Sequence, residues 1–155
     1  MSIGLCDIAA AYHRKRQIQS RFVNLARNPG GKYIAASMTN SELIELAKAY
    51  VALSNSHRID LIMPMFAAGA LYASTAVGEH RGRATIGDMM HGFFSRYPDV
   101  HWHATNYRCT DHRVSFDFTM TANDATSGEG LERSGLEQFE FTADGSIKKI
   151  TVDTA

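Results

Sequence analysis

The chain has 155 residues, of which 45% are hydrophobic and 21% charged, as is typical of a single soluble globular domain with one core. Its 16 basic and 16 acidic residues cancel, and this balance argues against a nucleic-acid-binding protein. No apolar run approaches the roughly 20 residues of a membrane span, which argues against a membrane protein.

The cysteines and the first residues bear on the expected compartment. Cys6 and Cys109 are too few for a disulfide framework and lack the spacing of metal ligands. The start of the chain lacks the basic segment and long apolar stretch of a secretory signal. We therefore expect reduced thiols in a cytoplasmic protein.

The distribution of charge divides the chain near residue 37. Residues 1–37 hold six Lys or Arg residues and one acid, Asp7, a balance of +5. Residues 38–155 hold ten bases and fifteen acids, a balance of −5. We therefore expect a basic N-terminal extension over residues 1–37 and a folded domain over residues 38–155.

Apolar residues in the extension recur at helical spacing. Ile18, Phe22 and Leu25 predict a basic amphipathic helix, which ends before the Asn-Pro-Gly-Gly sequence at residues 28–31. Three interpretations are open: the helix packs on the domain, it serves as a targeting segment, or it does not belong to the functional protein. The third is supported by Met38, which is itself a plausible start. We favour a dispensable extension.

Two helices are predicted at the start of the domain. The first runs from residue 40 or 41 to about residue 54, and its apolar stripe is Leu43, Leu46, Ala47, Tyr50 and Val51. The second follows a break at residues 55–57 and tolerates Pro64 if this residue lies in its first turns. It has on one side Ile59, Ile62, Met63 and Phe66.

The rest of the domain is predicted to hold one further helix and six strands. Thr85 caps this helix, Pro98 ends it, and the residues spaced for burial are Ile86, Met89, Met90, Phe93, Phe94 and Tyr97. The strands cover residues 71–75, 80–83, 100–108, 113–121, 130–141 and 147–152. This order predicts an α+β domain with helices on one face of a curved, mostly antiparallel sheet that encloses a cone-shaped cavity.

The last two strands form the most informative segment. They are joined by Ala143-Asp144-Gly145, where Asp-Gly supplies the positive-φ positions of a tight hairpin turn. Side chains alternate across a strand, so Glu137 shares one face with Phe139 and Phe141. A carboxyl group among aromatic rings must find a partner or hold a proton, and both options indicate a pocket.

Several segments together resemble the nuclear transport factor 2-like superfamily, in particular its SnoaL-like and ketosteroid-isomerase-like branch. The resemblance covers about residues 40–153. It rests on residues 49–53 (AYVAL) leading to 59–66 (IDLIMPMF), on residues 80–83 (HRGR) opening a helix, and on residues 139–147 (FEFTADGSI). It implies a cone-shaped α+β barrel with N-terminal helices packed on the concave face of the sheet.

The resemblance also implies a set of functional residues. Ketosteroid isomerase forms an oxyanion hole from a helix tyrosine and a protonated acid, and moves the proton with a carboxylate on the first strand. Tyr50 matches the tyrosine and Glu137 the acid, whereas Ser74 stands where the carboxylate base would be. Serine cannot shuttle a carbon-bound proton without a partner, so the ketosteroid isomerase reaction itself is not expected.

Apolar residues are expected to line the cavity around this pair. The alternating stripe Val114, Phe116, Phe118 and Met120 would form one wall, with Met89 and Trp102 across from it. The remaining expected substrate-binding residues are Met63, Phe66, Tyr72, Ser74 and Phe139. The alternation of this stripe by itself predicts only that its side chains are buried in the core. The stripe lines a binding site only if a cavity remains beside it.

Histidines offer a replacement for the missing base. His101 and His103 lie on one strand face with Trp102 on the other, and we name His103 as a candidate catalytic residue. An H-x-H pair also suits a metal, but no third ligand is placed by the sequence, so neither a metal nor another cofactor is expected.

Two functional hypotheses follow. In the first, the protein is a cofactor-independent isomerase, dehydratase or cyclase that stabilises an enolate in an apolar pocket. In the second, it is a noncatalytic small-ligand-binding or dimerisation domain, which Ser74 favours. The resemblance further implies a homodimer through the outer face of the sheet, where short polar side chains alternate at Ser115, Asp117, Thr119 and Thr121.

Overall fold

The computed structural model of the protein describes residues 13, 16–17 and 37–155. The helix expected around Ile18, Phe22 and Leu25 lies outside the described residues. In chain order the elements are α2 (Asn40–Asn55), α3 (Ile59–Ile62), the 3-10 helix η1 (Met63–Met65), β1 (Phe66–Ser74), β2 (Gly78–Arg81), α4 (Arg83–Arg96), β3 (His101–Thr110), β4 (Arg113–Asn123), β5 (Gly130–Phe141) and β6 (Ile147–Thr154). No helix among the described residues is long and apolar enough to cross a bilayer.

Helix α2 forms where the sequence predicts it. Thr39 caps its N-terminus by accepting a hydrogen bond from the Glu42 amide at 3.2 Å, and the Glu42 carboxylate accepts one from the Thr39 amide at 2.9 Å. This reciprocal capping satisfies two otherwise unpaired amide groups. The apolar stripe of α2, which includes Leu43, Leu46 and Tyr50, is buried against the sheet.

The second predicted helix is wrong in its extent. Only residues Ile59–Ile62 are α-helical, and Pro64 lies in the single 3-10 turn that follows. Phe66, which was expected on this helix, is instead the first residue of β1, where its side chain is fully buried. Proline removes a backbone donor and so favours an early end to a helix.

The start of the third predicted helix also differs. Helix α4 begins at Arg83, two residues before Thr85, and its N-cap is Gly82 with φ of 86°. The Gly82 amide donates to the Ala70 carbonyl at 2.8 Å, which fixes the turn between β2 and α4. Because this positive φ favours glycine, the backbone already turns into the helix at Gly82 rather than at Thr85.

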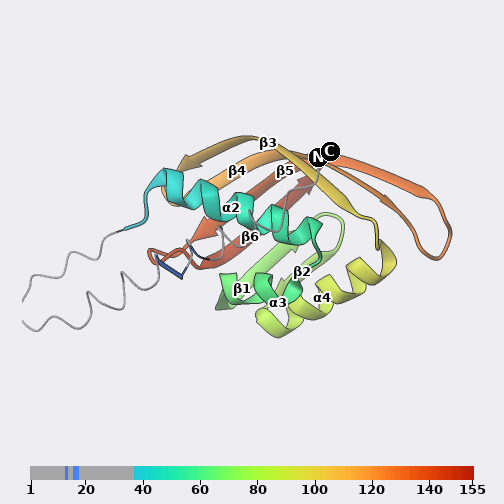
Figure 1. Cartoon of the computed structure of the whole chain (residues 1–155), viewed down its shortest axis with the longest axis horizontal. Helices are drawn as coiled ribbons and strands as arrows, with labels where there is room; N and C mark the ends of the chain where they lie inside the picture. The colour runs from blue at the N-terminus through green and yellow to red at the C-terminus, as the bar shows by residue number, and fades with distance from the viewer. Residues whose placement is uncertain (1–12, 14–15, 18–36) are drawn as a thin grey trace, which may run out of the picture.

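The six strands form one sheet in the order β2-β1-β6-β5-β4-β3. All neighbours are antiparallel except β1 and β6, which are parallel. The sheet is strongly curved, and α2 and α4 lie on its concave side (Figure 1). Helix α2 packs mainly on β3, and α4 on β1 and β2. The expected α+β fold is therefore confirmed.

The β5–β6 turn is longer than the predicted tight turn. Phe141 pairs with Ile147, so residues 142–146 form the connection. Within this loop Gly145 has a positive φ of 82°, whereas Asp144 does not adopt a positive φ. The Ser146 amide donates to Thr142 Oγ1 at 3.0 Å and the Gly145 amide to the Thr142 carbonyl at 3.0 Å. The loop is thus held by a side chain as well as by glycine.

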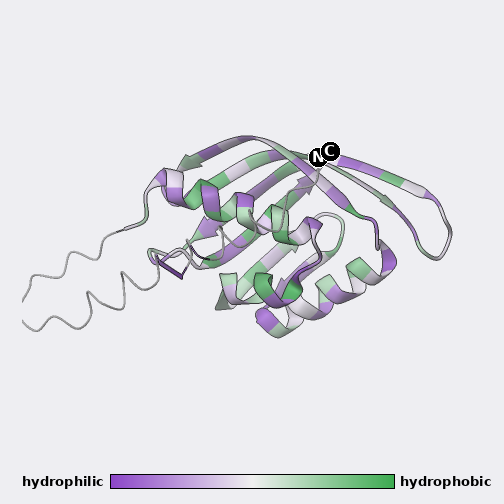
Figure 2. Ribbon diagram, viewed as in Figure 1, coloured by the Kyte–Doolittle hydropathy of each residue, from purple (hydrophilic) through white to green (hydrophobic). Residues whose placement is uncertain are grey.

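Hydrophobic and hydrophilic residues alternate along the strands and along α2, as Figure 2 shows. On β4, Val114, Phe116, Phe118 and Met120 are buried, while the residues between them are half-buried. This alternation directs one face of the sheet toward the helices and the other away from them.

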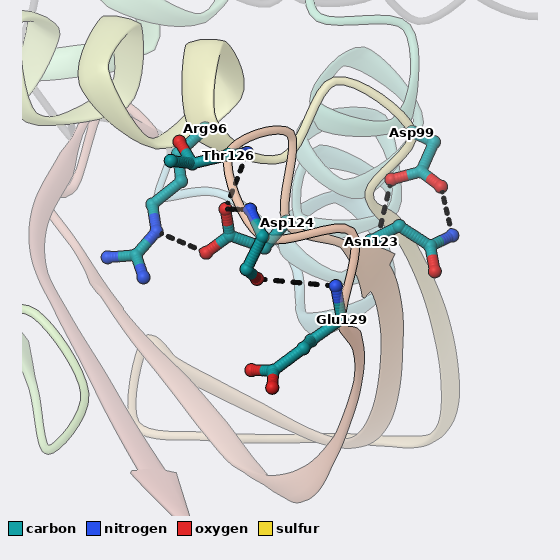
Figure 3. Close-up of polar contacts among 7 residues, drawn as sticks. Arg96, Asp99, Asn123, Asp124, Thr126 and Glu129 are labelled. Carbon is teal, nitrogen blue, oxygen red and sulfur yellow. Dashed lines mark hydrogen bonds and ion pairs between the residues drawn. The ribbon is translucent and has the colours of Figure 1, made fainter.

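A polar cluster joins the end of α4 to the β4–β5 connection (Figure 3). Arg96 Nε donates to Asp124 Oδ2 at 2.8 Å, and the Asp124 amide donates to the Glu129 carbonyl at 2.9 Å. Nearby, Asp99 accepts hydrogen bonds from the amide and the side chain of Asn123. The Arg96 guanidinium, with backbone amide donors, holds the pKa of Asp124 below its usual range. These contacts fix α4 relative to the sheet.

We predict that Gly135→Ala destabilises the fold by about 1–3 kcal/mol, the usual cost of overpacking. A methyl group there would lie 2.0 Å from the Asp153 carbonyl oxygen on the neighbouring strand β6. Gly92→Ala is the matched control, because a Cβ at Gly92 meets nothing within 4 Å in the exposed part of α4. Alanine there should stabilise by up to about 1 kcal/mol. Urea unfolding of both variants measures the difference, and equal stabilities would contradict it.

Candidate functional site

A cavity lies between the concave face of the sheet and helices α2 and α4. The cavity has a volume of about 70 Å³. Its lining is mostly apolar and aromatic, with a few polar groups. The lining residues are Tyr50, Val51, Ser54, Tyr72, Ser74, Ala76, Val77, Met89, Met90, Phe93, Phe94, Trp102, Phe118, Met120, Arg133, Glu137, Val152 and Thr154.

Helix α2 supplies Tyr50, which is 5% exposed. Its ring meets Phe139 edge-on at 4.9 Å and Phe66 edge-on at 6.1 Å between centroids. These two rings fix the position of the phenol. Burial raises the pKa of the Tyr50 hydroxyl well above its ordinary value, with smaller contributions from Tyr72 and Glu137, whereas a hydrogen bond with Ser54 opposes the rise. Tyr50 is therefore a neutral hydrogen-bond donor at physiological pH.

Strand β5 supplies Glu137, which is also 5% exposed. Burial raises the pKa of its carboxyl group to about 8. No residue among 37–155 forms a hydrogen bond or ion pair with this carboxyl group, and since no unpaired side-chain oxygen in this part of the chain is completely buried, its oxygens are open to the cavity that it lines. A buried carboxyl group without a cationic partner retains its proton, so Glu137 is mostly neutral at pH 7.

A second phenol lies in the same cavity. Tyr72 comes from β1, and burial followed by the charge of Glu137 raises the pKa of its hydroxyl well above the ordinary value. Glu137 contributes to the pKa shifts of both Tyr50 and Tyr72, so the three groups share one electrostatic environment. The cavity thus presents three neutral groups that can each donate a hydrogen bond.

Helix α4 and strand β3 supply an aromatic wall of the cavity, which consists of Phe93, Phe94 and Trp102. Trp102 lies 6.0 Å from Phe93 and 6.2 Å from Phe94 between ring centroids. The backbone of Trp102 is held by Asn55, whose side chain accepts from the Trp102 amide at 2.8 Å and donates to its carbonyl at 2.9 Å. This role of Asn55 could not be predicted from the sequence, because the two residues are 47 positions apart.

Eight of the residues expected at the site are brought together around the cavity: Tyr50, Tyr72, Ser74, Met89, Trp102, Phe118, Met120 and Glu137. Six expected residues lie elsewhere, and one of them, His103, is described in the next paragraph. Phe66, Val114, Phe116 and Phe139 are fully buried core residues and Met63 packs against the core beside α4. Phe66 and Phe139 still support the site, because their rings contact Tyr50.

His103 does not line the cavity. It is exposed on β3, next to Trp102, and adjacent residues on a strand point to opposite faces. Its neighbour in the expected pair, His101, is exposed as well. Within the described part of the chain, no group of three or more His, Cys, Asp or Glu side chains gathers as a metal site would require.

Comparison with curated proteins gave no sequence match. Solved structures share the fold at low sequence identity. AclR, a putative hydroxylase from Streptomyces galilaeus, is 18% identical with a TM-score of 0.66, over 76% of this chain and 91% of that one. SalBIII, described as an epoxide hydrolase/cyclase-like enzyme in pyran ring formation in polyether salinomycin, is 15% identical with a TM-score of 0.67, over 74% and 92%. A putative isomerase from Bacillus subtilis is 17% identical with a TM-score of 0.66, over 76% and 90%.

The sequence model of the SnoaL-like domain matches residues 47–150, from the middle of α2 to β6. This match spans more than half of the chain and most of the elements that surround the cavity. The protein therefore belongs to the SnoaL-like family, within the nuclear transport factor 2-like fold.

Proposed function

We propose that the cavity binds a mostly apolar small molecule and stabilises an enolate or phenolate oxygen, as a cofactor-independent isomerase, dehydratase or cyclase. The observation that carries this proposal is that the buried carboxyl group of Glu137, which pairs with no residue among 37–155, lines the same mostly apolar cavity as the buried phenol of Tyr50. Buried polar groups aimed at an otherwise apolar cavity are typical of ligand and active sites.

The chemistry follows from the protonation state. Burial raises the pKa of Glu137 to about 8, so its carboxyl group donates a hydrogen bond at pH 7, as does the Tyr50 phenol. Two donors in a site shielded from water stabilise an oxygen more strongly as it gains negative charge. Loss of one such donor costs enzymes ~2.7–4 kcal/mol of transition-state stabilisation.

Proton removal from carbon requires a base, and here the proposal departs from ketosteroid isomerase. Ser74 occupies the expected place of the base, and its hydroxyl accepts a hydrogen bond from the Ala76 amide at 3.1 Å. His103 is exposed away from the cavity, so the proposal does not use it. We propose that a bound water takes the proton, because an ionised Glu137 could no longer donate a hydrogen bond to the oxyanion.

The fold neighbours are compatible with this class of reaction. They include a putative hydroxylase, a putative isomerase and an epoxide hydrolase/cyclase-like enzyme in pyran ring formation. At 15–18% identity they support the fold, and their substrates are not transferred to this chain.

The alternative is a noncatalytic ligand-binding or dimerisation domain, and Ser74 in place of the base is the observation that favours it.

We further propose a cytoplasmic homodimer that buries the outer face of the sheet. This face presents Asp117 and Thr119 on β4, and Leu136 on β5, which pairs with Asp117 and is 36% exposed.

We predict that the protein binds 2-naphthol and lowers the pKa of the bound phenol. Tyr50→Phe and Glu137→Gln should each weaken binding of the naphtholate about tenfold or more, because charge-assisted hydrogen bonds contribute ~1.5–3 kcal/mol. Fluorescence titration at a series of pH values measures both quantities.

Two variants serve as matched controls for this titration. Tyr97→Phe removes a hydroxyl outside the cavity and Glu132→Gln removes an exposed carboxylate of β5. Neither should change the titration. If naphthol binds but its pKa is unaltered by Tyr50→Phe and Glu137→Gln, the site is a binding pocket without an oxyanion hole.

We also predict that stability falls as pH rises from about 4.5 to about 8. Glu137 has a folded-state pKa of about 8 against an ordinary value of 4.5, so over this range the unfolded chain loses a proton that the folded chain retains. The folded state is therefore penalised by up to about 1.4 kcal/mol per pH unit, relative to Glu137→Gln. Urea unfolding at several pH values checks this, with Glu132→Gln as control, and parallel curves for wild type and Glu137→Gln would refute it.

A further inference from the structure

Arg133 is a cavity-lining arginine without a side-chain partner in the described part of the chain. Its half-buried side chain lines the cavity from β5. Arg58, Arg96, Arg108 and Arg113 each pair with a carboxylate, whereas Arg133 forms no ion pair or hydrogen bond with any side chain of residues 37–155. The guanidinium is therefore available to a ligand.

The strand geometry places Arg133 and Glu137 on one wall. The two residues are four positions apart on β5 and so share a face, and in an ideal extended strand their Cα atoms would be roughly 13 Å apart. Between them lies Gly135, where β5 approaches β6 so closely that a Cβ would lie 2.0 Å from the Asp153 carbonyl oxygen. Met120, opposite Arg133, and Val152, opposite Glu137, also line the cavity and continue the wall on either side.

The charges in the lining differ at the two ends of this wall. Apart from the two tyrosines, the ionisable side chains of the lining are Arg133 and Glu137. Glu137 is mostly neutral at pH 7. Arg133 thus gives the cavity a net positive charge next to apolar walls, where electrostatic attraction is stronger than in bulk water. One planar guanidinium matches one carboxylate through two parallel hydrogen bonds.

We propose that the ligand is an apolar, ring-containing carboxylate, whose carboxylate binds Arg133 while the reacting oxygen at its far end meets Tyr50 and Glu137. The contact of the reacting oxygen with Tyr50 and Glu137 rests on the proposed function, whereas the contact of the carboxylate rests on Arg133 alone. The separation along β5 suits a molecule about two fused rings long, with the acid and the oxygen at opposite ends. The neutral carboxyl group of Glu137 does not repel such an anion.

The test compares 6-hydroxy-2-naphthoate with its methyl ester, which has the same rings and phenol but no charge. Wild type should bind the carboxylate at least about tenfold more tightly, or about 1.4 kcal/mol. Arg133→Gln should remove this preference without changing the affinity for the ester. Arg133→Lys should keep part of it, because lysine retains the charge but not the planar fork. Arg81→Gln, an exposed arginine outside the cavity, is the control.

The outcomes separate this inference from the proposed function. Equal binding of acid and ester by wild type, or equal effects of Arg133→Gln on both, would overturn it. If neither compound binds, it falls together with the proposed function. If Arg133→Gln removes the preference while Tyr50→Phe and Glu137→Gln leave the pKa of the bound phenol unchanged, the carboxylate site stands and the oxyanion hole does not.

Discussion

The carboxyl group of Glu137 is held inside a mostly apolar cavity and forms no ion pair with any residue among 37–155, and this constraint determines what the site can do. An ionised carboxylate in such surroundings would lose its hydration without compensation, so the group retains its proton up to a pH of about 8. A protonated acid is a donor rather than an acceptor. Together with Tyr50 it turns an apolar cavity into one that favours negative charge on a ligand oxygen.

The fold maintains this arrangement through contacts outside the cavity. Phe66 and Phe139 fix the ring of Tyr50, and Asn55 holds the backbone of Trp102. At the C-terminal end of α4, Arg96 forms an ion pair with Asp124, which joins the helix to the β4–β5 connection. Two helices thus cover different parts of one curved sheet (Figure 1).

Much of the fold could be predicted because strands and helices have distinct hydrophobic periods. The buried place of Glu137 follows from alternation with Phe139 and Phe141, and that of Tyr50 from the apolar stripe of α2. Phe66 was misplaced because a short apolar run around a proline fits a helix or a strand equally well. The five-residue β5–β6 connection was mistaken for a tight turn because the hydroxyl of Thr142 stabilises a longer loop.

The errors within the site have a different origin. His103 and Trp102 are neighbours on β3, and neighbouring residues of a strand point to opposite faces. The two side chains therefore cannot both line one cavity, although histidine is the usual choice for a base. Arg133 shares its strand face with Glu137 and could have been found by the same rule. Asn55 could not, because nothing in a single sequence indicates which distant backbone an asparagine side chain will meet.

The most direct test of the central claim is the titration of Glu137 itself. In protein labelled with ¹³C at the glutamate side-chain carboxyl group, the Glu137 signal is assigned by its absence in Glu137→Gln. We expect its chemical shift to change with a midpoint near pH 8, as burial without a cationic partner requires. A midpoint near the ordinary value of 4.5 would show an ionised carboxylate at neutral pH and would contradict the proposed pair of neutral donors.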